Sequence, residues 1–295
     1  MSAFQGAWPA LLTPSTADGG VHEPTLRALV RYLLDKRVGG LYICGSTGEG
    51  IFMPVAWRRR VAEIVLDEVS GQVPVIVHVG ACSVADAVEL ARHARSAGAA
   101  GVSSIIPPLY NSAAAVYAYF SAVAGAVPDV PFLPYIFGGP ADAVSLMREL
   151  MSVPNLAGTK YTGPNMHEFR QIVTLRDQDW TVFSGMDEQC LFAAMLGASG
   201  NIGSTLNFMP GVYREIHHLL RDGDVDRALE LQIEANRVTA ILQWFGFAGA
   251  LREVMRMIGF DCGNPRLPAL PLSDQDREAL RLQLAGTRFE ELVAL

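Results

Sequence analysis

The chain has 295 residues, of which 50% are hydrophobic and only 18% are charged, so we expect a large core and covered surfaces that include subunit contacts. The net charge is −7 and the arginines are scattered, which argues against nucleic-acid binding; the run Arg58-Arg59-Arg60 is interpreted as a solvated helix face. No basic leader and no apolar run of about 18 residues occurs, so we expect a cytoplasmic protein that does not enter the membrane.

Short apolar or β-rich runs alternate along the chain with segments of helical spacing, which predicts parallel βαβ units. Eight such runs favour a closed (β/α)8 TIM barrel over an open sheet. The predicted strands are Ala7–Thr13, Gly40–Cys44, Val73–Val79, Gly101–Ile106, Val130–Phe137, Leu156–Tyr161, Trp180–Ser184 and Gly200–Ser204. The intervening predicted helices are Glu23–Lys36, Ala56–Val69, Val84–Ala97, Ala113–Ala126, Ala141–Met151, Met166–Arg176 and Glu188–Leu196.

The part of the chain after Ser204 contains no further convincing strand. We therefore expect a barrel over residues 1–220 and a C-terminal helical extension over residues 221–295, packed together as a single structural unit. The helices predicted here are Gly211–Leu220, Val225–Trp244, Phe247–Ile258 and Asp274–Leu284.

Lys160 is one of only two lysines, the other being Lys36, and it stands at the end of an apolar predicted strand. Burial disfavours the charged form of an amine, so this position favours a nucleophilic amine. The alternative is a lysine whose head reaches solvent or pairs with a carboxylate. Tyr135, on the neighbouring predicted strand, would be a core aromatic by itself but is a candidate proton carrier beside an amine.

In a barrel, reactive residues gather at the C-terminal ends of the strands. The turn Gly45–Gly50 offers backbone N–H groups and two hydroxyls, which suit a carboxylate, although it could be only a tight turn. Asp187 and Glu188 could accept hydrogen bonds from a polyhydroxylated ligand, or could simply be acidic residues that start a helix. His78 is interpreted as a satisfied core residue. The four dispersed cysteines lack metal-ligand spacing, and no metal is indicated.

Gly45-Ser-Thr-Gly-Glu49, Tyr110, Tyr135 and Gly158-Thr-Lys160, in this order, resemble the N-acetylneuraminate lyase / dihydrodipicolinate synthase family of pyruvate-dependent class I aldolases. The resemblance implies a cofactor-free reaction in which Lys160 forms a Schiff base with a 2-oxo acid. It implies that Ser46 and Thr47 hold the substrate carboxylate. Tyr135 would be the proton shuttle, with Thr47 and Tyr110 as its relay. The family also implies a homotetramer in which Tyr110 comes from an adjacent subunit.

Within this family, Gly185-Met-Asp187-Glu188 resembles the lyase subgroup that cleaves N-acetylneuraminate, in which Thr162, Gly185, Asp187, Glu188 and Ser204 would contact the sugar chain. The segment Tyr135–Pro140 lacks the arginine of the synthases, but Ile136 and Gly138 also replace the Asn and Pro of the lyase pattern. Another 2-keto-3-deoxy sugar acid aldolase, a related hydratase, or a barrel that only binds 2-oxo acids therefore remain alternatives.

Overall fold

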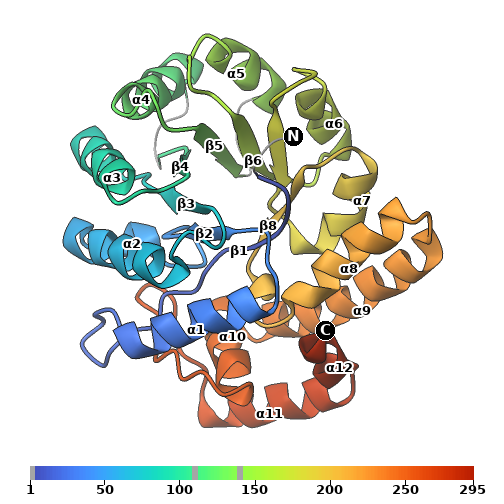
Figure 1. The fold of residues 1–295 in the computed structure, drawn as a ribbon. Helices are drawn as coiled ribbons and strands as arrows, with labels where there is room; N and C mark the ends of the chain where they lie inside the picture. The colour runs from blue at the N-terminus through green and yellow to red at the C-terminus, as the bar shows by residue number, and fades with distance from the viewer. Residues whose placement is uncertain (1–3, 108–111, 138–141) are drawn as a thin grey trace.

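The computed structural model describes residues 4–107, 112–137 and 142–295. Its centre is one parallel sheet in the order β1-β8-β7-β6-β5-β4-β3-β2, and a bridge between Ala10 and Tyr42 joins the two outer strands into a ring (Figure 1). The predicted TIM barrel is confirmed. The strands are β1 Gly6–Pro9, β2 Leu41–Ile43, β3 Val75–His78, β4 Gly101–Ile105, β5 Phe132–Phe137, β6 Gly158–Thr162, β7 Thr181–Ser184 and β8 Gly200–Gly203.

Helices surround the strand ring, and hydroxyl side chains start several of them. Ser83 and Ser112, for example, accept the backbone N–H of Asp86 and Ala115 and so cap the helices that follow. Each predicted helical segment overlaps an observed helix, and the short α12 was not predicted. The helices are α1 Glu23–Asp35, α2 Val55–Val69, α3 Val84–Ser96, α4 Ala113–Gly125, α5 Ala143–Leu150, α6 Met166–Val173, α7 Cys190–Met195, α8 Pro210–Arg221, α9 Val225–Trp244, α10 Phe247–Met257, α11 Asp274–Ala285 and α12 Phe289–Ala294.

Large side chains fill the inside of the barrel because alternate residues of each strand point inward. Trp8 is fully buried, and its ring centre lies 5.7 Å from that of Phe4 and 5.3 Å from that of Phe183. Tyr42 and Ile76 belong to the same inner cluster. A second, larger apolar cluster lies between the strands and the helices. The inside of the barrel is therefore a packed core and not an open channel.

The interpretation of Arg58-Arg59-Arg60 as a solvated face is wrong for its first member. Arg58 is 3% exposed, and its guanidinium donates to the carbonyl oxygens of Gly80 at 2.9 Å and His78 at 2.7 Å. A buried carbonyl at the end of a strand needs a donor, and a buried arginine needs acceptors, so each satisfies the other. Arg59 and Arg60 are exposed, as expected.

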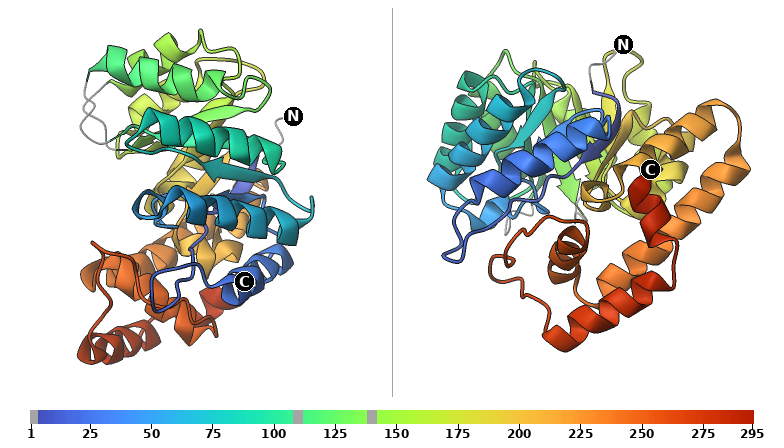
Figure 2. Two further views of the ribbon diagram at one scale, coloured as in Figure 1. Left: turned by 90° about the vertical axis from the view of Figure 1, so that its left-hand side faces the viewer. Right: turned by 60° about the horizontal axis from the view of Figure 1, so that its bottom comes forward.

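The C-terminal helices pack beside the barrel, where α9 runs along α8 and α11 contacts α9 and α10 (Figure 2). A buried ion-pair cluster connects α10 to the glycine-rich turn. The Glu49 carboxylate lies 2.7 Å from the guanidinium of Arg252 and 2.9 Å from that of Arg266. None of the helices in the described ranges is long and apolar enough to cross a membrane.

Candidate functional site

Lys160 lies inside the barrel mouth against two tyrosine rings. The strand register pairs it with Tyr135 of β5, and its side chain is 5% exposed. Its Nζ lies 4.1 Å from the centre of the Tyr135 ring and 4.8 Å from that of Tyr42. Tyr135 was predicted to lie beside Lys160 from the sequence, whereas Tyr42 was not predicted to be a site residue. Strand alternation could have identified Tyr42, because successive side chains of a strand point to opposite faces and Tyr42 lies between Leu41 and Ile43, whose side chains point away from the inside of the barrel.

Tyr135 belongs to an aromatic cluster at the C-terminal ends of β2, β3 and β5. Its ring meets those of Tyr42, His78 and Phe137 edge-on, with centroid distances of 6.4, 6.3 and 6.0 Å. Phe137 is 56% exposed at the rim. Ile136, in contrast, is buried in the core between strands and helices, so this departure from the lyase pattern faces away from the mouth. Gly138 lies outside the described residues.

His78 connects two strand ends through its ring nitrogens. Nδ1 lies 3.1 Å from the carbonyl oxygen of Cys44, and Nε2 accepts the backbone N–H of Ile105 at 3.0 Å. Burial, together with the nearby cations Arg58 and Lys160, holds the pKa of His78 well below its ordinary value. The imidazole is therefore neutral, with the proton on Nδ1. This arrangement agrees with the interpretation of His78 as a satisfied core residue.

The glycine-rich turn brings two predicted site residues together. Thr47 Oγ1 and Ser204 Oγ, from the ends of β2 and β8, are hydrogen-bonded at 2.6 Å. They and the exposed Ser46 line a hollow of about 260 Å³ whose other walls are largely apolar side chains, including Phe247 of α10. The turn does not lead directly into α2, because a single 3₁₀ turn, Gly50–Phe52, comes between them.

Close packing requires glycine at two positions of this mouth. A Cβ on Gly45 would lie 2.6 Å from the Tyr42 ring, so the glycine-rich turn rests on the tyrosine that contacts Lys160. A Cβ on Gly185 would lie 1.7 Å from Thr162 Oγ1 and 2.9 Å from Lys160 Cε. Thr162 Oγ1 is buried and has no hydrogen-bond partner among the described residues. Lys160, Thr162 and Gly185 therefore form one contact group.

Asp187 is buried beside the end of β8. Its Oδ2 accepts hydrogen bonds from the backbone N–H of Thr205 at 2.8 Å and from the Thr205 hydroxyl at 2.7 Å. Its Oδ1 is buried and has no partner within the described part of the chain. Burial raises the pKa of Asp187 to about 6 despite these hydrogen bonds. Glu188 is half-buried, and its Oε1 accepts from Nε2 of Gln243 at 2.5 Å. Tyr110 lies outside the described residues.

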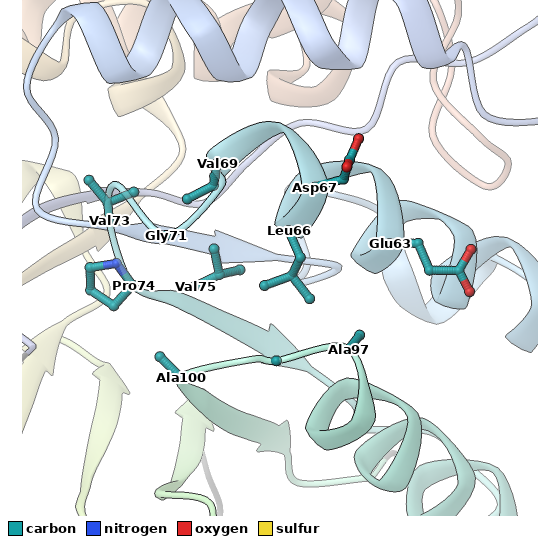
Figure 3. Close-up of a pocket in the computed structure, with 11 residues that line it drawn as sticks. Glu63, Leu66, Asp67, Val69, Gly71, Val73, Pro74, Val75, Ala97 and Ala100 are labelled. Carbon is teal, nitrogen blue, oxygen red and sulfur yellow. The ribbon is translucent and has the colours of Figure 1, made fainter.

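A larger hollow, of about 800 Å³, lies at the opposite end of the barrel near the starts of β3 and β4 (Figure 3). Its walls are mostly apolar. The two carboxylates at its edge already have partners, because Glu63 bonds to His93 at 2.9 Å and Asp67 to Arg27 at 2.7 Å. Among the described residues, the larger hollow therefore offers no unpaired acidic group, and it contains none of the candidate site residues, whereas Ser46, Thr47 and Ser204 line the smaller one.

The protein is therefore a (β/α)8 barrel that carries a buried lysine and a buried tyrosine at the C-terminal ends of adjacent strands. A sequence profile of the Dihydrodipicolinate synthetase family matches residues 3–286, and the chain belongs to this family. An N-acetylneuraminate lyase of Danio rerio is 32% identical over 287 residues, which cover 93% of this chain and 94% of that protein.

Two solved structures show the same similarity. The N-acetylneuraminate lyase of Proteus mirabilis is 29% identical with a TM-score of 0.92, and the match covers 97% of this chain and 99% of that one. YagE, an E. coli K12 prophage protein of the dihydrodipicolinic acid synthase family in complex with pyruvate, is 28% identical with a TM-score of 0.89. That match also covers 97% of this chain and 99% of the other.

Proposed function

We propose that this chain is a class I aldolase that cleaves N-acetylneuraminate, or a closely similar 2-keto-3-deoxy sugar acid, to pyruvate and an aldose. The observation that carries the proposal is the buried Lys160, whose Nζ lies 4.1 Å from the centre of the Tyr135 ring at the barrel mouth. Relatives named N-acetylneuraminate lyase match nearly the whole chain and support the choice of substrate.

The proposed reaction begins when the lone pair of the Lys160 amine attacks the C2 carbonyl of the open-chain sugar acid. An acid then adds one proton to the C2 oxygen, which leaves as water, and the product is a protonated Schiff base. A base removes the proton of the C4 hydroxyl, the C3–C4 bond breaks, and its electron pair moves into the iminium to give an enamine while the aldose leaves. Protonation at C3 and addition of water then release pyruvate and restore the amine. No separate cofactor takes part in this chemistry.

Tyr135 is the proposed proton carrier, because its ring packs against the lysine side chain. Thr47 is proposed to relay the proton with Tyr110, which an adjacent subunit of a homotetramer would supply. Ser46 and Thr47 are proposed to hold the substrate carboxylate at the glycine-rich turn. We also propose that the protein acts in the cytoplasm. A site shared between subunits would make assembly of the tetramer a condition for activity.

The hydroxyl-bearing chain of the substrate is proposed to lie along β6, β7 and β8. Thr162 Oγ1 and Asp187 Oδ1 are buried polar atoms without partners among the described residues, so both could bond a ligand hydroxyl. Glu188 and Ser204, with the backbone at Gly185, complete this side. Burial keeps Asp187 partly protonated near pH 6, so it can donate as well as accept.

The test is a coupled assay of pyruvate release from N-acetylneuraminate with the wild-type protein and the Lys160→Ala variant. We expect turnover by the wild type and none by the variant, with unchanged circular dichroism. Turnover by Lys160→Ala would contradict the Schiff-base mechanism. Pyruvate release from other 2-keto-3-deoxy sugar acids but not from N-acetylneuraminate would keep the aldolase chemistry and change the substrate, and binding of 2-oxo acids without any turnover would favour a non-catalytic barrel.

A further inference from the structure

Three amide side chains of α9 form a stripe that faces the loop after β7. Gln232, Asn236 and Gln243 are separated by four and seven residues, so at about 100° per residue they lie within roughly 40° of arc on one side of the helix. The α9 helix lies outside the strand ring (Figure 1) and packs against the 3₁₀ turn Asp187–Gln189. This helix therefore reaches the barrel mouth from the C-terminal part of the chain.

The first two amides hold the main chain of the loop. Gln232, 1% exposed, donates from Nε2 to the carbonyl oxygen of Asp187 at 3.0 Å, and its Oε1 accepts the N–H of Leu191 at 2.9 Å. Nε2 also donates to Asn236 Oδ1 at 2.8 Å, and Asn236 Nδ2 donates to the carbonyl oxygen of Glu188 at 3.1 Å. Shifting this loop would leave buried polar atoms unpaired, so the amides fix its backbone.

The third amide holds a carboxylate. Nε2 of Gln243, an exposed residue of α9, donates to Glu188 Oε1 at 2.5 Å. No described residue donates to the second oxygen, Oε2. One oxygen of Glu188 is thus held by the protein, and the other is left for a hydroxyl of a ligand.

We propose that this amide stripe positions Glu188 for the hydroxyl-bearing part of the substrate, and that Gln243 is a specificity-determining residue; this inference rests on the function proposed above. The amide stripe should affect the binding only of substrates that are long enough to contact Glu188. It leaves the reaction of the 2-oxo group with Lys160 unchanged. The enzyme would therefore prefer sugar acids over short 4-hydroxy-2-oxo acids, and Gln243 would contribute to that preference.

The experiment compares the Gln243→Leu and Gln243→Glu variants with the wild type, using Gln283→Leu as the matched control. Gln283 is an exposed residue of α11 whose side chain bonds to no described residue. kcat and KM are measured with N-acetylneuraminate and with 4-hydroxy-2-oxopentanoate, which yields pyruvate and acetaldehyde and has no distal hydroxyls. The rate of borohydride trapping of pyruvate on Lys160 is measured in parallel.

We expect Gln243→Leu to lower kcat/KM for N-acetylneuraminate by about five- to tenfold, mainly through KM, because the one exposed hydrogen bond that orients the Glu188 side chain is lost. The short substrate and the trapping rate should change by less than about twofold, since neither involves the distal hydroxyls. Gln243→Glu keeps the size but loses the donor, so it should lose at least as much. Gln283→Leu should behave as wild type.

Equal losses on both substrates in Gln243→Leu would indicate a general structural role and overturn the inference. An unchanged or improved kcat/KM for N-acetylneuraminate would do the same, since Gln243 would then compete with the substrate for Glu188. The wild-type rate on N-acetylneuraminate tests the proposed function separately. A wild type that cleaves only the short substrate overturns both that function and this inference.

Discussion

The Gly185→Ala variant tests whether the position of the Lys160 side chain depends on its close packing against Gly185. The added Cβ would lie 1.7 Å from Thr162 Oγ1 and 2.9 Å from Lys160 Cε, whereas ordinary carbon contacts are about 3.5–4.0 Å. Lys160 Cε would therefore have to move by roughly 1 Å. Overpacking of this kind costs about 1–3 kcal/mol of stability, and a misplacement of about 1 Å costs on the order of 100-fold in rate.

The assay follows borohydride trapping of pyruvate against time, with urea unfolding measured on the same samples. We expect slower trapping by about 100-fold at a modest cost in stability. Gly125→Ala is the matched control, because its Cβ meets no atom within 4 Å, so its trapping rate should equal that of the wild type. Adding Thr162→Ala to Gly185→Ala removes the shortest contact and should restore part of the rate. A wild-type rate in Gly185→Ala would refute the reasoning.

Three further predictions concern the buried acids and assembly. Folding raises the pKa of Asp187 to about 6, so the folded state keeps this proton to a higher pH than the unfolded state does. Between about pH 4 and about pH 7, the wild type should therefore lose about 2–3 kcal/mol of unfolding free energy relative to Asp187→Asn, as measured by urea unfolding. A difference between the two proteins that does not change with pH would contradict this. Glu49→Gln leaves Arg252 and Arg266 buried without a counter-charge and should cost about 3–5 kcal/mol of stability, whereas a loss below about 1 kcal/mol would mean that the pairs are not needed. Light scattering should give the mass of four chains of 31.8 kDa, and the mass of one chain would contradict the shared site.

The sequence was sufficient to predict the fold because each strand and helix carries its own periodic signal. Eight apolar runs alternating with helical segments leave few other arrangements, and all eight correspond to observed strands. The predicted β1 was too long, since Ala7–Thr13 continues past Pro9 as buried but non-strand chain. The short α12 was missed because six residues, Phe289–Ala294, give less than two turns of periodicity.

The site was only partly predictable from the sequence. Strand ends placed Lys160 beside Tyr135, but local patterns do not report contacts between distant segments, such as Thr47 with Ser204. The charged run at 58–60 was misread for the same reason, because the carbonyls that Arg58 binds come from another element. The link from Gln243 to Glu188 spans 55 residues and has no local signature.

The central claim is that Lys160 is the Schiff-base lysine, and the most direct measurement is borohydride reduction with pyruvate followed by peptide mass analysis. The chain has one other lysine, Lys36, whose Nζ donates to the carbonyl oxygens of Val293 and Ala294 at 2.8 and 3.0 Å. It therefore serves as an internal control. A reduced pyruvate adduct on the Lys160 peptide alone is the predicted result, and an adduct only on Lys36, or none, would contradict the account.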